Sequence, residues 1–362
     1  MERILVYGMN KNRGGIESYL INYSKHFKTE KIMFDYVTEA SEIAYEREIK
    51  ELEGHIYYIP RKKKKPLQHL LQFKKILKNH NEYKIVYFNI LSASYVYTMF
   101  SLLGNKNIKI VVHSHNNNAQ KLWLHLLCRP ILNLFPMKRL ACSKEAGEFM
   151  FGKRYVREDK VKIINNAIEI KKNIYSPLRR ENIRNSLNIS SKFVVGSVGR
   201  LSYQKNSLFI IDIFSEIYKK DKSAVLIIAG EGDYRKKCEE YIKQKDIKDV
   251  VYLLGMRNDI PELLQGMDVF LLPSKFEGLG MVLIEAQAAG LRCFTSRGTV
   301  PKEVKVTPEV EFISLKDSAK EWANIILQNR NYSRQNYTLS IKEHGFDIDT
   351  EAKKLETLFL TI

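Results

Sequence analysis

Cysteine is scarce in this sequence, which has only four among 362 residues. They are Cys128, Cys142, Cys238 and Cys293, and no two of them have the Cys-x-x-Cys spacing of a redox pair or a zinc site. This scarcity argues against a disulfide framework. It predicts reduced, buried thiols in a cytosolic protein.

Long apolar runs are also absent. None reaches the roughly 18 residues that a membrane-spanning helix requires. Met1, Glu2 and Arg3 lead directly into a strand-like run, which indicates that no signal peptide is present. We therefore expect a cytoplasmic protein that does not cross a membrane.

The fingerprints of dinucleotide and ATP sites are missing as well. The strand-like run Ile4–Tyr7 leads through a loop to Gly14 and Gly15, where a helix starts. This segment has neither a Gly-x-Gly-x-x-Gly pattern nor the Gly-Lys-Ser/Thr of a phosphate loop. It is either a plain turn or a loop that approaches a ligand, and residues 12–15 are candidates for the second role.

Positive charge, in contrast, is abundant: 59 Lys and Arg against 41 Asp and Glu give a net charge of +18. The block Arg61–Lys65 precedes leucines at helical spacing, and Lys121–Phe135 is apolar with cationic edges. Both segments are typical of helices that lie on anionic membranes, but each fits an ordinary core helix with a solvated lysine face equally well. Because the lysines are spread along the chain and no recognition motif is present, nucleic acid is disfavoured as a partner.

Strand-like runs alternate with helical periodicity, which predicts an α/β fold with a parallel sheet in each half of the chain. We expect a first domain over residues 1–175, a second over 176–345, and a C-terminal helix over 346–362 that packs back toward the first. The charged segment Pro177–Asn188 is predicted to connect the domains. The predicted strands are Arg3–Tyr7, Ile56–Ile59, Ile85–Phe88, Ile108–Val112, Leu140–Ser143, Val161–Ile164, Val194–Val198, Val225–Gly230, Val250–Leu254, Val269–Leu272 and Cys293–Ser296.

The segment after the apolar run Asp268–Pro273 is the most informative part of the sequence. It passes through Gly278 and Gly280 into a run of helix formers and contains two carboxylates, Glu277 and Glu285. The first amides of a helix lack partners and bind anions, and carboxylates accept hydrogen bonds from sugar hydroxyls. This pattern predicts a nucleotide-sugar pocket. The alternative is one solvated glutamate in a loop and another on a helix.

Two cations follow an earlier predicted strand. Arg200 and Lys205 come after the run Val194–Val198, so they leave the carboxyl end of a strand, where open α/β sheets bind ligands. A guanidinium and a mobile ammonium suit a diphosphate. Two ordinary surface cations are the alternative.

His113 and His115 stand at the end of another predicted strand, where their spacing puts them on one face. A metal pair is conceivable, but no Cys or carboxylate nearby completes a ligand set, so we predict no metal site.

Residues 273–290 resemble the Glu-x7-Glu signature of glycosyltransferase family 4, whose members are retaining enzymes of the GT-B fold. Residues 199–206 resemble the diphosphate-binding motif of that family, and residues 228–232 with 254–261 resemble its nucleotide-base pocket. The resemblance covers nearly the whole chain and is closest to capsular and exopolysaccharide glycosyltransferases. One departure is Ala167, where the family usually has glycine.

The resemblance implies two Rossmann-like domains whose parallel sheets face each other across a cleft. It implies retaining transfer of a sugar from a nucleoside-diphosphate sugar, most often a UDP-sugar, to a saccharide or lipid-linked saccharide in bacterial surface-polysaccharide biosynthesis. No metal or other cofactor is expected. Such an enzyme would lie at the cytoplasmic face of the cell membrane.

The resemblance also assigns roles to individual residues. The sugar would meet Glu277 and one histidine, His115 rather than His113, although the register of the strand leaves that choice open. The diphosphate would meet Arg200, Lys205 and the backbone of Gly14, Gly15, Gly278, Leu279 and Gly280, whereas the nucleoside would meet Glu285, Gly230, Arg257 and Asn258.

Two other functions fit part of this pattern. A nucleotide-sugar epimerase of the same architecture would bind the same donor but would need further acid and base residues. A non-catalytic partner subunit of a glycosyltransferase pair would usually lack one of the paired cations or glutamates, and here all four are present. The sequence does not identify the sugar, the acceptor or the linkage.

Overall fold

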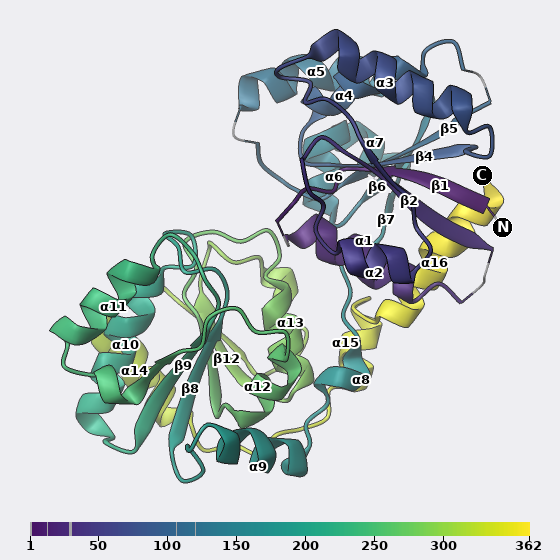
Figure 1. Cartoon of the computed structure of the whole chain (residues 1–362). Helices are drawn as coiled ribbons and strands as arrows, with labels where there is room; N and C mark the ends of the chain where they lie inside the picture. The colour runs from purple at the N-terminus through teal and green to yellow at the C-terminus, as the bar shows by residue number, and fades with distance from the viewer. Residues whose placement is uncertain (1, 13, 29–30, 106, 120) are drawn as a thin grey trace. The chain divides into compact units, whose positions relative to one another are not determined.

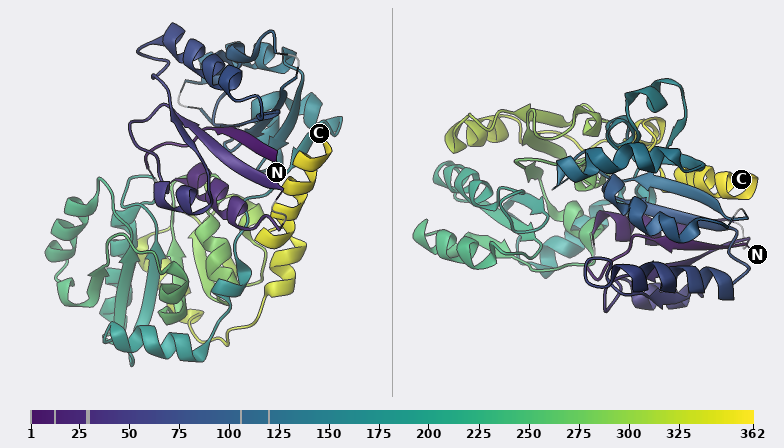
Figure 2. Two further views of the ribbon diagram at one scale, coloured as in Figure 1. Left: turned by 45° about the vertical axis from the view of Figure 1, so that its right-hand side comes forward. Right: turned by 90° about the horizontal axis from the view of Figure 1, so that it is seen from above.

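The computed structural model describes residues 2–12, 14–28, 31–105, 107–119 and 121–362. The chain divides into two units, one formed by Met1–Ala167 with Ile348–Ile362 and the other by Ile168–Asp347 (Figure 1, Figure 2). The sequence predicted divisions after residues 175 and 345, whereas the structure divides after residues 167 and 347. Among the described residues, the helices are all too short or too polar to traverse a bilayer.

The first unit is built on a seven-stranded sheet in the order β3-β2-β1-β4-β5-β6-β7, in which every neighbouring pair is parallel. All residues of β4 are buried, as expected for a parallel strand that is covered on both faces. The strands are β1 (Glu2–Tyr7), β2 (Ile32–Thr38), β3 (Ile56–Tyr58), β4 (Ile85–Ile90), β5 (Lys109–Ser114), β6 (Met137–Ala141) and β7 (Val161–Ile163).

Helices cover both faces of this sheet, with a separate hydrophobic core on each face. The C-terminal helix α16 packs into one of these cores, where Phe359 lies edge-on against Tyr87 at a ring-centroid distance of 5.1 Å. The helices of this unit are α1 (Gly15–Lys25), α2 (Glu46–Glu51), α3 (Pro66–Asn79), η1 (Ala93–Tyr95), α4 (Val96–Met99), η2 (Phe100–Leu102), α5 (Leu122–Leu134), α6 (Lys144–Phe151), α7 (Lys153–Arg157) and α16 (Ile348–Thr361).

The second unit has a six-stranded parallel sheet in the order β10-β9-β8-β11-β12-β13. Its strands are β8 (Phe193–Val198), β9 (Ala224–Ala229), β10 (Val251–Leu253), β11 (Val269–Leu272), β12 (Arg292–Ser296) and β13 (Val310–Ile313). Its helices are α8 (Ile170–Asn173), α9 (Pro177–Ser186), α10 (Ser207–Lys220), α11 (Arg235–Gln244), η3 (Lys248–Val250), α12 (Ile260–Gly266), α13 (Met281–Ala288), η4 (Lys302–Val304), α14 (Ala319–Gln328) and α15 (Thr338–Glu343).

The strand order of the second unit determines where a ligand can bind. From β8 the chain continues to β9 on one side, and β11 pairs with β8 on the other side. Open α/β sheets bind ligands at such a switch point, beyond the carboxyl ends of the strands. The loops that follow β8 and β11 meet this condition, and they contain the cations and glutamates singled out in the sequence.

Every run that the sequence predicted as a strand lies wholly or partly within one, but β2 and β13 were missed. Asp35 interrupts the apolar pattern of β2; it is fully buried because it forms an ion pair with Arg3 at 2.6 Å. In β13, which is only four residues long, Glu311 breaks the pattern in the same way.

The prediction that Pro177–Asn188 connects the domains was wrong, because most of this segment is the helix α9 of the second unit. Ser176 caps the helix by accepting the backbone N–H of Arg179, and Pro177 occupies the first turn. The charges that suggested a linker are used in packing. Arg179 forms a bidentate ion pair with Glu262, and both of its N–O distances are 2.7 Å.

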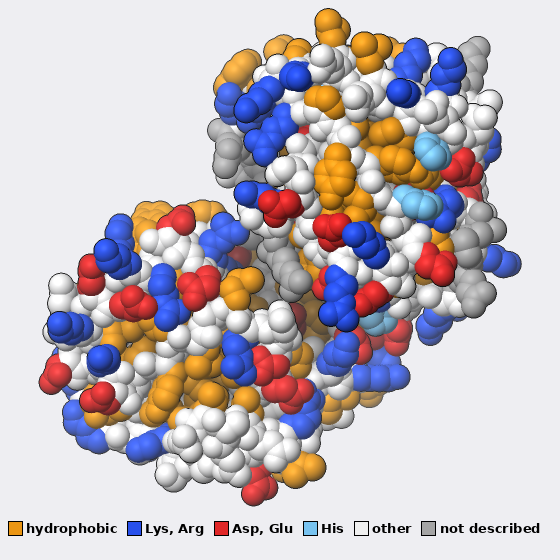
Figure 3. Space-filling view, viewed as in Figure 1, with side chains coloured by type: hydrophobic (Ala, Val, Ile, Leu, Met, Phe, Trp, Pro, Cys, Tyr) orange, Lys and Arg blue, Asp and Glu red, His pale blue; other side chains and the backbone are white. Residues whose placement is uncertain are grey.

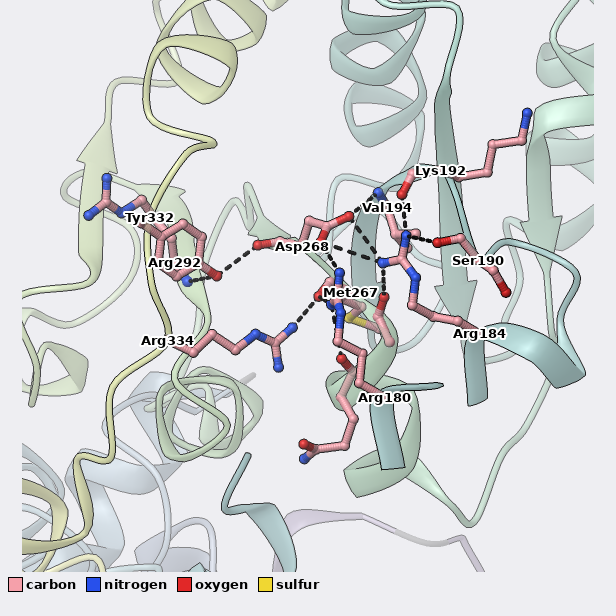
Figure 4. A network of polar contacts seen from close by, with 12 residues as sticks. Arg180, Arg184, Ser190, Lys192, Val194, Met267, Asp268, Arg292, Tyr332 and Arg334 are labelled. Atoms are coloured by element: carbon pink, nitrogen blue, oxygen red, sulfur yellow. Dashed lines mark hydrogen bonds and ion pairs between the residues drawn. The ribbon is translucent and has the colours of Figure 1, made fainter. Parts of the chain in front are cut away.

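The other two arginines of α9 bind the end of α12 and the start of β11 (Figure 4). Arg180 donates to the carbonyl of Met267 at 2.8 Å, and Arg184 donates to that of Gly266 at 2.9 Å. Both also reach Asp268, whose carboxylate accepts the backbone N–H of Val194 at 2.7 Å. Because the final carbonyls of a helix lack partners within it, these arginines stabilise the C-terminus of α12.

Candidate active site

Glu277 lies in the turn between β11 and α13, with its side chain only 6% exposed. Its Oε1 atom accepts the ammonium of Lys205 at 2.5 Å and the hydroxyl of Ser274 at 2.6 Å. No described residue bonds to Oε2. Glu277 is therefore not a solvated loop residue: the protein holds one carboxylate oxygen and leaves the other available to a ligand.

The loop after β8 and the loop after β11 are joined along their length. The backbone N–H of Lys275 donates to the carbonyl of Gln204 at 2.8 Å, and the Gln204 amide donates to the carbonyl of Phe276 at 3.1 Å. The Asn206 amide donates to the carbonyl of Pro273 at 3.1 Å. The two sequence motifs therefore form one structure, although Lys205 and Glu277 are 72 positions apart.

A small hydroxyl network supports this turn from behind, and the sequence analysis missed it. The carbonyl of Ser274 accepts the hydroxyls of Ser296 at 2.5 Å and Thr299 at 2.7 Å. The backbone N–H of Glu277 donates to the carbonyl of Thr299 at 3.1 Å. Ser274 and Ser296 are fully buried. The sequence did contain a signal for this network, because Ser274 and Ser296 lie at the carboxyl ends of the adjacent strands β11 and β12.

Glu285 is the fifth residue of α13. It is half-buried, and no described residue forms a hydrogen bond or ion pair with its carboxylate. Burial raises the pKa of Glu285 to about 7. The reading of Glu285 as a solvated helix residue is thus wrong. A poorly solvated carboxylate without a partner is a group that gains from accepting hydroxyl hydrogen bonds.

The N-terminus of α13 has no side-chain cap among the described residues. Gly280 precedes the helix in the left-handed region, with φ at 81°. Gly278 is exposed, and a β-carbon on it would meet nothing within 4 Å. Because the first amides of a helix lack partners within it, this end can accept an anion. Leu279 is half-buried and packs against the core beneath the turn.

The two predicted phosphate cations lie in different environments. Arg200 is exposed, and no described residue bonds to its guanidinium, whereas the Lys205 side chain is 19% exposed and is paired with Glu277. Lys205 therefore also positions the carboxylate, a role that the sequence did not predict.

Gly230 brings the loop after β9 against the loop after β8. Its φ is 144°, and a β-carbon would lie 2.0 Å from the carbonyl oxygen of Gly199. The backbone N–H of Gly230 donates to the carbonyl of Gly255 at 2.7 Å, which adds the loop after β10. That loop carries Arg257 and Asn258, both exposed; Arg257 pairs with Asp259 at 2.5 Å. Gly230 thus allows the backbones of these loops to pack closely, because it has no side chain.

His113 and His115 belong to the first unit and share one face of β5 and its extension, with ring centroids 4.1 Å apart. His113 is fully buried and hydrogen-bonds with the hydroxyl of Tyr87 at 2.5 Å. His115 is half-buried and donates from Nε2 to the amide oxygen of Asn89 at 2.8 Å. Burial lowers the pKa of His115 to about 3, so the ring is neutral.

Each of the two rings has one hydrogen-bonded nitrogen and one nitrogen without a partner among the described residues. With Nε2 donating to Asn89, the neutral ring of His115 carries its lone pair on Nδ1, which has no partner among the described residues. Burial distinguishes the two: His113 is fully buried, whereas His115 is half-buried. Across the described residues, no group of three or more His, Cys, Asp and Glu side chains is arranged to hold a metal ion.

The glycine loop of the first unit already binds a carboxylate. Glu17, only 6% exposed, accepts the backbone N–H of Asn10 at 3.0 Å, and its other oxygen lies 2.7 Å from where a β-carbon on Gly14 would stand. Gly15 is exposed at the start of α1, and Arg13, part of the predicted 12–15 loop, lies outside the described residues. The sequence analysis missed Glu17, which supplies a negative charge at the N-terminus of α1.

Comparison with known proteins agrees with this architecture. The family model described as Glycosyltransferase Family 4 matches residues 13–172, and the model described as Glycosyl transferases group 1 matches residues 179–332. The first match lies in the first unit apart from its last residues, and the second lies within the second unit.

Individual relatives extend over most of the chain. The putative glycosyltransferase EpsF of Bacillus subtilis is 27% identical over 335 residues, which are 90% of this chain and 87% of EpsF. The capsular polysaccharide biosynthesis glycosyltransferase CapH of Staphylococcus aureus is 24% identical over 360 residues, covering 97% of this chain and 96% of CapH.

Among solved structures, Alr3699/HepE of Anabaena, crystallised in complex with UDP and glucose, superposes with a TM-score of 0.79. The superposition covers 100% of both chains at 20% sequence identity. The fold is therefore GT-B, with two Rossmann-like domains. The chain belongs to the glycosyltransferases that combine a family 4 domain with a group 1 domain.

Proposed function

We propose that this glycosyltransferase transfers a sugar, with retention of anomeric configuration, from a UDP-sugar to a saccharide or lipid-linked saccharide acceptor. The arrangement around Glu277 carries the proposal. One carboxylate oxygen is held by Lys205 and Ser274, and the other is available to a sugar hydroxyl. The complexes of HepE with UDP and glucose support the choice of donor.

In such a transfer the leaving diphosphate gains negative charge while the anomeric carbon becomes cationic. Preorganised positive charge near the phosphates therefore lowers the barrier. We assign this role to Arg200, to the uncapped amides at the start of α13 and to the ammonium of Lys205. These groups supply the charge that a divalent metal provides in other transferases, which supports metal-independent transfer.

Glu285 suits the ribose of the donor. Its carboxylate has no partner among the described residues and its pKa is raised to about 7, so two ribose hydroxyls would improve its environment. We retain His115 over His113 as the residue that contacts the transferred sugar, because the His115 side chain is only half-buried, whereas His113 is fully buried in the core. The nucleoside base is assigned to the loop of Arg257 and Asn258.

The polysaccharide assignment rests on CapH, which acts in capsular polysaccharide biosynthesis and aligns over 97% of this chain. We propose that the acceptor is likewise a growing surface polysaccharide or its lipid-linked precursor. The protein would then work at the cytoplasmic face of the membrane that holds the acceptor.

The decisive experiment is incubation with a panel of UDP-hexoses, with and without saccharide acceptors, followed by NMR of the product linkage. We expect an α-linked product from an α-linked donor, and release of UDP that depends on acceptor. A β-linked product would contradict retention. Conversion of one UDP-sugar into another without acceptor would instead establish an epimerase.

A further inference from the structure

Helix α5 is anchored to the first unit through polar contacts on its inner side. His125 is fully buried; its Nδ1 accepts the backbone N–H of Ala93 at 3.1 Å, and its Nε2 donates to the carbonyl of Phe149 at 3.0 Å. Asn133 donates to the carbonyl of Phe151 at 3.0 Å. A histidine is thus buried where an amphipathic helix normally buries leucine.

The outer side of α5 is apolar instead. We call the residues Leu122, Trp123, Leu126, Leu127, Ile131 and Leu134 the α5 face; they are exposed by between 39% and 82%. At 100° per residue they cover about half of the helix circumference, and no acidic residue occurs in the helix. Such a contiguous exposed apolar surface marks an interaction site rather than a protein core.

Helix α3 adds leucines and cations to the same layer. Helix α4 packs against both α3 and α5, and all three cover one face of the sheet. On α3, Leu67 is 73% exposed and Leu71 is 66% exposed, and Lys74, Lys75 and Lys78 are exposed between them and the helix end. In Figure 3, hydrophobic side chains project at the rim of this unit over α3 and α5, with Lys and Arg side chains beside them.

The charge of the chain is concentrated in the part of the sequence that carries these helices. From residue 54 to residue 144 there are 16 Lys and Arg but a single carboxylate, Glu82, so this segment carries most of the net charge of +18. Lys and Arg are about as frequent here as in the rest of the chain, so the excess of positive charge comes from the scarcity of Asp and Glu. A cationic surface around an apolar face complements an anionic bilayer, which offers phosphates at its surface and acyl chains below.

One lysine of the basic block does not contribute to this surface. Lys62 is 19% exposed, pairs with Glu39 at 2.7 Å and lies over the ring of Tyr95 at 3.9 Å. Burial lowers the pKa of Lys62. Lys63, Lys64 and Lys65 are exposed. The block therefore consists of one structural lysine and three that face solvent.

We propose that the α5 face inserts into the acyl-chain boundary of an anionic membrane, while the exposed lysines of α3 bind lipid phosphates. Two other occupants fit less well. A second copy of the chain would bring two strongly cationic surfaces together, and a nucleic acid would leave the leucines exposed to water. The proposed lipid-linked acceptor gives a reason for membrane binding, but the evidence for the membrane surface comes from α3 and α5 alone.

The chain offers a probe for the α5 face. It has two tryptophans, Trp123 on the α5 face, 66% exposed, and Trp322 in the core of the second unit, 0% exposed. With vesicles of phosphatidylglycerol and phosphatidylcholine, we expect the Trp123 emission to shift to the blue and to be quenched by lipids brominated on their acyl chains. Trp123→Phe should abolish the quenching. Absence of quenching in the wild type overturns the proposal.

A matched pair of substitutions tests the role of the apolar surface. Leu127→Glu places a charge on the α5 face, and Leu178→Glu places one on α9 of the second unit, at a side chain that is 66% exposed against 64% for Leu127. We expect at least a tenfold loss of vesicle partitioning for Leu127→Glu and none for Leu178→Glu. Equal partitioning of both variants, or a wild-type dimer in sedimentation that Leu127→Glu dissociates, overturns the proposal.

Binding of UDP, measured on the same variants, separates this inference from the proposed function. We expect Leu127→Glu to bind UDP as the wild type does, because the UDP site is assigned to the second unit. Vesicle binding without sugar transfer would refute only the proposed function. Sugar transfer without vesicle binding would refute only the membrane surface.

Discussion

The ammonium of Lys205 and the hydroxyl of Ser274 share one oxygen of the Glu277 carboxylate, at 2.5 and 2.6 Å. Both contacts go to Oε1, and Oε2 has no hydrogen-bond partner among the described residues. The pairing links the proposed phosphate-binding loop to the proposed sugar-binding turn.

Glu277→Gln should lower kcat and leave UDP binding nearly unchanged, because the carboxylate is proposed to meet the sugar and not the nucleotide. A hydrogen bond to a charged group is worth about 1.5–3 kcal/mol, so kcat should fall by a factor of roughly 10 to 150. Steady-state kinetics and calorimetric titration with UDP check both parts. Near-normal turnover in a folded variant would refute the proposed role of Glu277 in binding the sugar.

Arg200→Ala and Lys205→Met should differ in stability although both impair transfer. Arg200 is exposed and unpaired in the described structure, so its loss should change the free energy of unfolding by less than about 0.5 kcal/mol. Lys205 pairs with a carboxylate that is 6% exposed, so its loss should cost about 2 kcal/mol. Urea denaturation measures the difference, and equal stability of the two variants would contradict the ion pair.

Glu285 should make UDP binding depend on pH. Its pKa is raised from 4.5 to about 7, so the carboxylate is increasingly protonated below pH 7 and loses its capacity to accept ribose hydroxyls. We therefore expect the UDP dissociation constant to rise as the pH falls from 8 to 6. Glu285→Gln should remove this dependence while raising the donor KM roughly 10- to 150-fold.

The same group makes a prediction about stability. A carboxyl whose folded-state pKa lies above its unfolded-state value destabilises the fold at high pH, and this cost disappears as the pH falls through the window from about 7 to 4.5. Glu285→Gln should thus stabilise the ligand-free protein by about 3 kcal/mol at pH 8 and hardly at all at pH 4.5. Thermal unfolding at both pH values checks the sign.

UDP should stabilise the protein in the presence of EDTA, because the proposed site uses protein cations in place of a metal. At 100 times the dissociation constant, a ligand adds about 2.7 kcal/mol. Thermal shift with UDP, and with GDP as the matched control, measures this effect. A strict requirement for magnesium or manganese would refute the metal-free site, and a larger shift with GDP would redirect the donor to a GDP-sugar.

Local patterns in the sequence were sufficient to predict much of the fold. Fully buried parallel strands such as β4 and β9 appear as continuous apolar runs, so they could be read directly. β2 could not, because Asp35 is acceptable there only through its pairing with Arg3, which comes from another strand. The arginines of α9 suggested a solvated linker for the same reason: their partners lie more than 80 positions away in the sequence.

The site shows the same limit. The motifs identified Glu277, Glu285, Arg200 and Lys205 as candidates, but the pairing of Lys205 with Glu277 arises only from the folding of two distant loops against each other. Glu17 and Thr299 lie outside those motifs and act through backbone amides and carbonyls. The exposure of Trp123 and Leu134 was equally hidden, because a leucine-rich helix resembles a core helix until its burial is known.

The return of the C-terminal helix α16 to the first unit has a consequence for biosynthesis. Ribosomes deliver residues in order, so the whole of the second unit, Ile168–Asp347, emerges before Leu355 and Phe359 are available to fill the first unit's core. The second unit can therefore finish folding before the first unit does. A released chain that ends at residue 347 should contain a protease-resistant second unit and a first unit whose hydrophobic face still binds chaperones.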